Sequence, residues 1–310
     1  MKLSIVATLY QSTPYIADFY RRASIAAKEL VGDSYEIVLV NDGSPDNSLE
    51  LAVQLTKQDS HVVVVDLSRN FGHHKAMMTG LSYAAGEKIF LIDSDLEEQP
   101  EWLVSFDQQF NQEAVDVIYG VQDKRKGNWF ERWSGEWFYL LFNWLSGLDL
   151  PANIVTARLM SRRYVDALLK YREREILIAG LWYITGFKQM PQYVRKCANS
   201  PTTYTFYRKI SLLVNAVTSF SSKPLISIFY AGAIISTVSL IYMLYLFLNY
   251  FFWAKPLVGW TSVMGSVWLL GGLIIFSIGV VGIYLSKIFS EVKQRPYVIV
   301  RDVYQKNKSD

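Results

Sequence analysis

The chain has 310 residues, a formal net charge of +3 and a hydrophobic fraction of 51%. So small a net charge gives no indication of a nucleic-acid partner, and none is expected; the positive mean hydropathy favours a membrane-associated protein. The single cysteine, Cys197, excludes an internal disulfide and a cysteine-based metal cluster. The first residues, MKLSIVATLY, read as a strand and lack the apolar segment of a signal peptide.

The first 121 residues alternate between apolar runs and amphipathic stretches. The apolar runs predict strands at residues 3–10, 35–42, 62–68, 88–95 and 115–121. The stretches between them predict helices at Pro14–Val31, Asp46–Lys57, His73–Ala85 and Pro100–Asn111. Strands that are apolar throughout are buried on both faces. The alternation therefore predicts an α/β domain with a mostly parallel sheet covered by helices.

Polar residues gather where four of the predicted strands end. They are Thr8 and Tyr10, then Asn41, Asp42, Gly43 and Ser44, then Arg69, Asn70 and Lys75, and finally Asp93, Ser94 and Asp95. Ligands bind beyond the carboxyl ends of parallel strands, so these residues predict one site. His73 and His74 start the helix beside it. Adjacent histidines point to different sides, which favours a solvated helix start or a phosphate contact over a metal site.

Asp93 and Asp95 end the fourth predicted strand and face the same way if that strand continues through them. Two neighbouring carboxylates repel each other unless a cation joins them. Mg²⁺ and Mn²⁺ prefer such oxygen ligands and also hold substrate phosphates, so we predict a metal site at Asp93 and Asp95. The alternative is that acids here cap the following helix, and for Glu98 and Glu101 that capping role is favoured.

The rest of the chain indicates a membrane. Two uncharged stretches of 31 residues separate Lys223, Lys255 and Lys287. Each exceeds the roughly 20 residues that cross a bilayer, so we predict spans at Ile226–Tyr250 and Val263–Leu285. Basic residues concentrate before the first span and after the second, and basic residues remain cytoplasmic. The large N-terminal domain and the C-terminus of this integral inner- or plasma-membrane protein are therefore expected in the cytosol.

Two further segments are candidates for the membrane interface. Residues 205–220 combine basic residues with an apolar stripe just before the first span. Residues 129–148 carry aromatic residues at helical spacing, for which packing in a protein core is an equal alternative.

The segments VNDGSPD, NFGHHKAMMTGL and DSDLEEQPE, in this order, resemble glycosyltransferase family 2, whose members have the GT-A fold. The two apolar stretches followed by GIYLSKIFSEVKQRPYVIV are similar to its polyprenyl-phosphate glycosyltransferases, the GtrB-like and dolichyl-phosphate mannose synthase-like group. This resemblance implies a GT-A catalytic domain at residues 1–200, a juxtamembrane amphipathic helix at 201–224, two transmembrane helices at 225–286 and a basic tail at 287–310.

The resemblance implies inverting transfer of one hexose from a nucleotide sugar, with UDP-glucose favoured, to a polyprenyl phosphate such as undecaprenyl phosphate. The cofactor would be Mg²⁺ or Mn²⁺, and a homo-oligomer is left open. The implied donor-binding residues are Thr8, Tyr10, Asp42, Gly43, Asn70, Lys75, Asp93 and Ser94. The implied catalytic residues are Asp93, Asp95, Arg125 and Arg158. The candidate cations for the acceptor phosphate are Arg125, Arg132, Arg158 and Arg208.

Other functions are weighed against this one. A processive polysaccharide synthase would show Gln-x-x-Arg-Trp, whereas WFERW has Trp129 in place of the glutamine. An alcohol acceptor would require an acid as general base, and Thr156 stands where the family often has an acid. An inactive membrane scaffold that binds a nucleotide sugar would not require the intact Asp93–Asp95 pair. A donor other than UDP-glucose also stays open.

Overall fold

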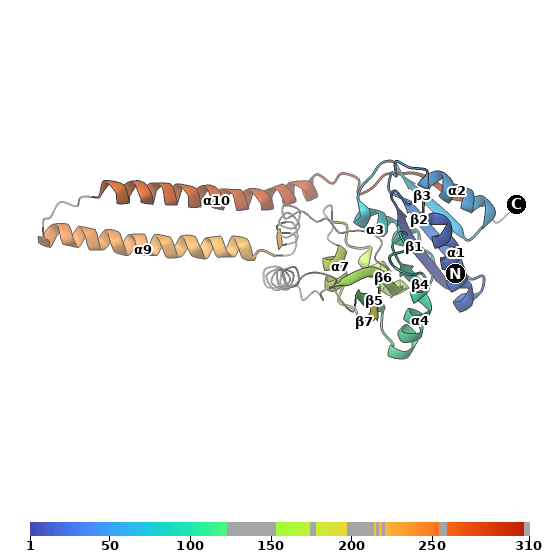
Figure 1. Ribbon diagram of the computed structural model, residues 1–310. Helices are drawn as coiled ribbons and strands as arrows, with labels where there is room; N and C mark the ends of the chain where they lie inside the picture. The colour runs from blue at the N-terminus through green and yellow to red at the C-terminus, as the bar shows by residue number, and fades with distance from the viewer. Residues whose placement is uncertain are drawn as a thin grey trace. The chain divides into compact units, whose positions relative to one another are not determined.

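The computed structural model describes residues 1–122, 153–173, 178–196, 214, 217–218, 221–253 and 259–306. The chain divides into two compact units. Unit 1 comprises Met1–Tyr139, Asp149–Tyr204 and Arg295–Asp310, and unit 2 comprises Leu140–Leu148 and Thr205–Gln294. Unit 1 contains the sheet, and unit 2 contains two long helices (Figure 1).

Unit 1 is built on a mixed sheet whose eight described strands lie in the order β7-β5-β6-β4-β1-β2-β3-β8. Their bounds are β1 Leu3–Leu9, β2 Tyr35–Asn41, β3 Val62–Leu67, β4 Lys88–Leu91, β5 Val117–Gln122, β6 Ile154–Ser161, β7 Gln189–Val194 and β8 Val300–Gln305. The central strands β3, β2, β1 and β4 are parallel, and so are β5 and β7. Strand β6 runs antiparallel to β4 and β5, and β8 runs antiparallel to β3. The predicted α/β class with a mostly parallel sheet is confirmed.

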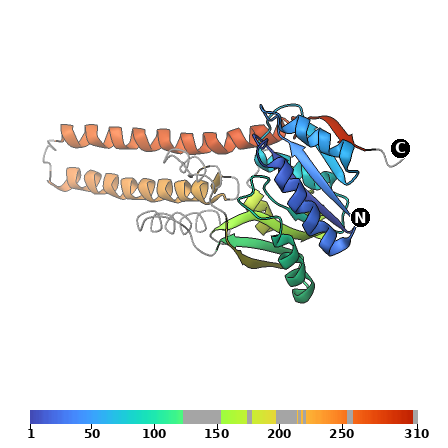
Figure 2. The same cartoon turned by 45° about the vertical axis from the view of Figure 1, so that its right-hand side comes forward.

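Helices cover both faces of this sheet (Figure 2). Their bounds are α1 Ile16–Val31, α2 Ser48–Gln58, α3 His73–Tyr83, α4 Trp102–Glu113, α6 Arg162–Leu168 and α7 Ile178–Ile184. Alternate residues of a strand point to opposite faces. Ile5 of β1 therefore joins the core that contains Phe19 of α1 and Phe106 of α4. Val6 faces α3, where a Cβ on Gly80 would lie 2.5 Å from its Cγ1, so a glycine allows the close approach of helix and sheet.

The end of the chain differs from the expected basic tail, because residues 300–305 form a strand of the sheet. Strand β8 pairs with β3 in the register Val63↔Gln305 to Leu67↔Val300, with an irregularity at Asp66 and Leu67. An unpaired β3 would present a row of free backbone groups at the sheet edge, and β8 satisfies them. The sequence pattern YVIVRDVYQ is compatible with a strand, but its partner lies more than 230 residues earlier in the chain.

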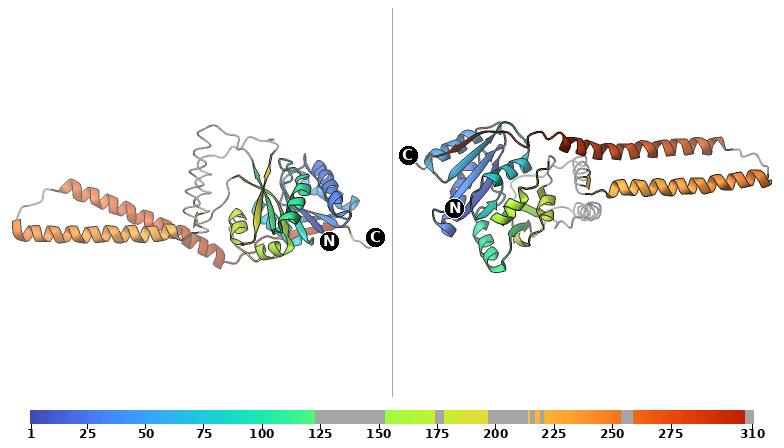
Figure 3. Two further views of the ribbon diagram at one scale, coloured as in Figure 1. Left: turned by 90° about the horizontal axis from the view of Figure 1, so that it is seen from below. Right: turned by 180° about the vertical axis from the view of Figure 1, so that it is seen from behind.

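Unit 2 contains α9, Lys223–Trp253, and α10, Trp260–Val292, which run in opposite directions along each other (Figure 3). The Tyr284 hydroxyl donates to the Ser221 carbonyl at 2.5 Å. Within the residues described, the segment Leu270–Val292 of α10 is long and apolar enough to cross a membrane, whereas the apolar segment Lys223–Ile235 of α9 is shorter. That both helices span a membrane stays a prediction.

Candidate active site

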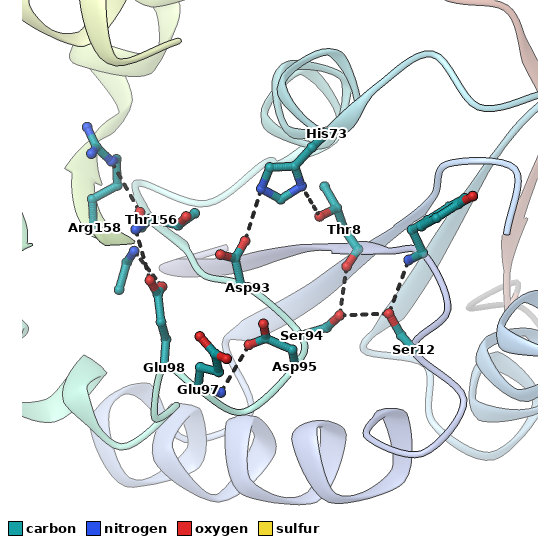
Figure 4. A network of polar contacts seen from close by, with 12 residues as sticks. Thr8, Ser12, His73, Asp93, Ser94, Asp95, Glu97, Glu98, Thr156 and Arg158 are labelled. Carbon is teal, nitrogen blue, oxygen red and sulfur yellow. Dashed lines mark hydrogen bonds and ion pairs between the residues drawn. The ribbon is translucent and has the colours of Figure 1, made fainter. Parts of the chain in front are cut away.

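The candidate residues lie where the parallel strands β1, β2, β3 and β4 end, the position that the strand pattern predicts for them (Figure 4). Thr8 is near the end of β1, and Asp42 directly follows β2. The loop after β3 leads to His73 at the start of α3, and the loop after β4 carries Asp93 and Asp95. Because the strands are parallel and in register, segments that are distant in sequence meet at this one edge.

The strand that precedes the two aspartates is shorter than predicted. Strand β4 ends at Leu91. One further backbone hydrogen bond, donated by the Ile92 amide to the Val6 carbonyl at 3.0 Å, extends the contact with β1. Asp93 and Asp95 therefore lie in a loop, and the expectation that an unbroken strand orients them is wrong. Leu96 directly after them has φ 62°, a left-handed backbone that turns the chain at this point.

Asp93 is held in place by a histidine. The His73 Nε2 lies 3.2 Å from the Asp93 Oδ1, and the His73 Nδ1 lies 3.0 Å from the Thr8 hydroxyl. Burial raises the pKa of Asp93, but the contact with His73 outweighs that effect and leaves the pKa lowered. Burial lowers the pKa of His73, and Asp93 reverses this, so the net shift is upward. The helix-start histidine is therefore a partner of the carboxylate.

The loop of the aspartate pair is crowded with negative charge. Burial raises the pKa of Asp95, and the charges of Asp93 and Glu97 raise it further, although the Glu97 amide donates to its Oδ1 at 3.0 Å. Of the residues described, none provides a hydrogen bond of good geometry to the buried Oδ1 of Asp93, and its contact with the His73 Nε2 at 3.2 Å is an ion pair only. A carboxylate oxygen that lacks a well-formed hydrogen bond keeps the capacity to bind a cation beside that contact.

The neighbouring loop, residues 68–72, is held by Asp42. This side chain is 2% exposed, and its two oxygens accept from the amides of Phe71 at 2.7 Å and Gly72 at 3.0 Å. Burial raises the pKa of Asp42 against the opposing effect of these bonds. Asp42 thus fixes the loop that leads to His73. Its predicted contact with a nucleotide stays a prediction.

Gly43 brings the turn after β2 against the same loop. Its φ is 59°, and a Cβ on it would lie 2.4 Å from the backbone of Arg69 and Asn70. We expect Gly43→Ala to cost about 1–2 kcal/mol for the left-handed backbone alone, and more because the 68–72 loop must move. Gly32→Ala is the control for a positive-φ glycine without a close neighbour, since Gly32 has φ 60° and ψ −134° and no described atom lies within 4 Å of its Cβ position. Unchanged hydrogen–deuterium exchange of the 68–72 amides in Gly43→Ala would contradict the role of the close contact.

A second acidic group, Glu98, joins three segments behind the site. It is fully buried, and its oxygens accept from the amides of Thr156 at 2.9 Å and Ala157 at 2.7 Å, both on β6. Lys196 follows β7 in the chain, and its ammonium lies 2.9 Å from the Oε1 of Glu98. Burial and the charge of Asp93 raise the pKa of Glu98 to about 7. Lys196 also lies within the electrostatic influence of Asp93 and Asp95.

The capping role that the sequence favours for Glu98 and Glu101 is wrong. Glu101 occupies the N-cap of α4 but makes no capping hydrogen bond with its side chain. It pairs instead with Arg22 of α1, at 2.6 Å between Nη2 and Oε2. The Glu98 side chain accepts hydrogen bonds from β6, a contact that the sequence does not predict. Several acids precede α4, and which of them is buried depends on the path of the loop.

Arg158 on β6 is buried, with 1% of its surface exposed. Its guanidinium stacks on the Trp182 ring of α7, and its Nε donates to the Thr156 carbonyl at 3.3 Å. Burial lowers its pKa to about 9. Its Nη2 lacks a hydrogen-bond partner among the residues described. The predicted contact of Arg158 with an acceptor phosphate stays a prediction.

The other predicted residues are distributed as follows. Ser94 is buried and donates to the Thr8 carbonyl at 2.8 Å, so it braces the loop from inside. Tyr10 is 50% exposed, Asn70 is exposed, and the Lys75 ammonium lies 5.8 Å from the Tyr297 ring centroid. Arg125, Arg132 and Arg208 lie outside the described residues, as do the segment 129–148 and most of 205–220.

A divalent metal ion is implied by the family that the sequence resembles, and the residues fit one. Within the described ranges no group of three or more His, Cys, Asp or Glu is arranged to hold a metal. Mg²⁺, however, is commonly held by one or two carboxylates together with substrate phosphates and water. Asp93 and Asp95 supply the two carboxylates. A cation would complete the contacts of the Asp93 Oδ1, which receives no hydrogen bond of good geometry from the described residues, and would offset the charge that raises the pKa of Asp95.

Comparison with known proteins agrees with this geometry. Residues 4–169 match the model of the family Glycosyl transferase family 2. A Mycobacterium tuberculosis protein described as a glycosyltransferase is 50% identical over 98% of this chain and 89% of that protein. The SfII prophage-derived bactoprenol glucosyl transferase of Shigella flexneri is 30% identical over 99% of this chain and 100% of that protein.

Among solved structures, the Staphylococcus aureus protein TarS in complex with UDP-GlcNAc covers 70% of this chain and 66% of its own, with a TM-score of 0.47 and 18% identity. The family match spans more than half of the chain, including all four strands that end at the site. The aspartate loop, the parallel strands that present it and the full-length relatives lead to one conclusion: this chain is a glycosyltransferase of the α/β GT-A class and belongs to glycosyltransferase family 2.

Proposed function

We propose that this enzyme transfers one glucose, with inversion, from UDP-glucose to a polyprenyl phosphate at the cytosolic face of the membrane, in a metal-dependent reaction. The observation that carries the transfer chemistry is the half-buried aspartate pair at the carboxyl ends of the parallel strands, in which the Oδ1 of Asp93 receives no hydrogen bond of good geometry from the described residues. The choice of a lipid acceptor and of glucose is based on the similarity to the bactoprenol glucosyl transferase of Shigella flexneri, which covers nearly the whole of both chains.

The roles of the residues follow from their chemistry. Asp93 and Asp95 would hold Mg²⁺ or Mn²⁺, which when bound supplies positive charge to the leaving diphosphate. His73, fixed by Thr8, orients Asp93. Asp42 fixes the 68–72 loop beside the donor.

A phosphate acceptor changes what the protein must provide. An alcohol must lose a proton as it attacks, so it needs a general base, whereas a lipid phosphate is already an anion. Its alignment with the anomeric carbon requires cations instead. Arg125, Arg132, Arg158 and Arg208 remain the candidates, and Lys196, near the aspartate pair, is added to them.

The test combines substrate and sidedness. Detergent-purified protein with undecaprenyl phosphate, Mg²⁺ or Mn²⁺ and a panel of labelled nucleotide sugars should transfer label to the organic phase from UDP-glucose only when metal is present. In sealed membrane vesicles, externally added donor should be used when the cytosolic face is outward and not in the opposite orientation. Transfer of label from a different donor would mean that another sugar, and not glucose, is transferred. Binding of a nucleotide sugar without any labelled lipid would point to an alcohol acceptor or an inactive binding module.

A further inference from the structure

The segment that follows α10, residues 295–305, lies against the loop that leads into the active site. It belongs to unit 1, and its strand β8 runs along β3. Beyond the end of the strand pair, the Ser68 amide donates to the Ile299 carbonyl at 2.9 Å. This contact continues past the last residue of β3, into the loop of residues 68–72.

Arg301 adds two contacts at the same point. Its Nη2 donates to the Ser68 carbonyl at 2.7 Å, and its Nη1 lies 3.4 Å from the Oδ2 of Asp66. Asp66 is 1% exposed and also accepts from the Asn41 side chain at 2.8 Å. The buried carboxylate therefore joins the end of β2 to β8. The Arg301 side chain itself is 54% exposed, so the core does not depend on its volume.

The 68–72 loop is consequently held from two sides. Asp42 and Gly43 hold it from the end of β2, through the Phe71 and Gly72 amides and the close approach to Arg69 and Asn70. Residues Ile299 and Arg301 hold it at Ser68. The Tyr297 ring also approaches Lys75, in the first turn of α3. The loop then leads directly to His73, which contacts Asp93.

Covering the edge of the sheet does not require these contacts. Pairing of β8 with β3 from Val63 to Leu67 already satisfies the edge. The Arg301 side chain reaches instead to the end of the strand and to the loop carbonyl beyond it. An arginine with several donors in a fixed plane is suited to hold a carboxylate and a carbonyl at once.

We propose that residues 295–305 form a strap that positions the 68–75 segment for donor binding, with Arg301 as its positioning residue. This inference rests on the proposed function in taking the donor to be a nucleotide sugar bound at this edge of the sheet. The strap follows α9 and α10 in the sequence but belongs to unit 1. The catalytic unit is therefore completed by residues that come after the two apolar helices in the chain.

The test compares Arg301→Ala, Arg301→Lys and Lys306→Ala in the full-length protein in detergent. Lys306 is an exposed basic residue just past the same strand, which makes it the matched control. Arg301→Ala should raise the KM for UDP-glucose about tenfold, the effect of losing roughly 1.4 kcal/mol of charge-assisted hydrogen bonding, with a much smaller change in kcat and in Tm. Arg301→Lys should recover part of the KM, and Lys306→Ala should match the wild type.

A second readout separates the strap from the reaction. Hydrogen–deuterium exchange of the amides at residues 68–75 should be faster in Arg301→Ala than in the wild type or in Lys306→Ala. If the wild type transfers no glucose but this exchange difference is present, the proposed function fails and the strap stands. Unchanged KM and unchanged exchange in Arg301→Ala would overturn the strap. A parallel loss of Tm, kcat and donor affinity would also overturn it, because that result indicates a role in stability alone.

Discussion

Asp93→Asn is expected to lower kcat/KM for UDP-glucose at least about a hundredfold, the scale of loss when one charged or dipolar group that stabilises the transition state is removed. The amide has the shape of the carboxylate but not its charge, so it binds a divalent ion poorly. The change in stability should be small, because the substitution relieves the repulsion that raises the pKa of Asp95 and Glu98 but also removes the ion pair with His73 that lowers the pKa of Asp93. Steady-state kinetics with Mn²⁺ titration and thermal unfolding measure the two effects.

Asp33→Asn is the control for this substitution, since Asp33 is exposed and precedes β2 at the opposite end of the strand. It should leave both activity and stability unchanged. Calorimetric binding of UDP-glucose in the presence and absence of Mn²⁺ gives a readout independent of turnover, and the metal-dependent part should disappear in Asp93→Asn. Full activity of Asp93→Asn with metal present would refute the assignment of Asp93 as a metal ligand.

Glu98→Gln is expected to lower the free energy of unfolding by about 1–3 kcal/mol, because an amide nitrogen replaces one of the two carboxylate oxygens that accept from the Thr156 and Ala157 amides and from Lys196. For a unit of this size the Tm should fall by roughly 5 °C. The double variant Glu98→Gln with Lys196→Met should recover part of the loss, since it removes both charges. The exposed pair Arg22–Glu101 provides the control, and Glu101→Gln should cost about 1 kcal/mol or less.

The same pair predicts a dependence on pH. The pKa of Glu98 is about 7 in the folded protein against its usual 4.5, so the folded state binds more protons between these values. Its contribution to stability is therefore complete below about pH 4.5 and is lost as the pH rises through 7. Lys196→Met should cost little stability at pH 6, where Glu98 can be protonated, and more at pH 8. An equal cost at both pH values would contradict the pairing.

The helices α1 to α4 and the strands β1 to β5 could be predicted because local pattern decides them. Their apolar runs are long, and turn residues separate them, so burial on both faces of a parallel sheet is written into the sequence. The position of Asp93 at the edge of this sheet followed from the same pattern, since parallel strands bring their carboxyl ends together. The predicted end of β4 was too late by four residues, because Ile92 continues the apolar run after the paired strand has ended.

The roles of Glu98, His73 and Arg301 could not be predicted in this way. Each depends on a partner that is distant in sequence: Thr156 and Lys196 for Glu98, Asp93 for His73, and Asp66 for Arg301. The spacing of apolar and polar residues along the chain contains no information on such long-range pairs. A carboxylate before a helix is compatible with capping or with burial, and the choice depends on whether a donor from elsewhere is present.

The sequence alone determined the class of the domain and the edge of the sheet at which the candidate aspartate pair lies, because hydrophobic alternation and strand direction are local properties that fix where strand ends meet. The tertiary structure alone decided which acid is buried, which histidine orients Asp93 and that the last described residues complete the sheet. These outcomes depend on desolvation and on long-range pairing, whose free energies exist only once distant segments are brought together.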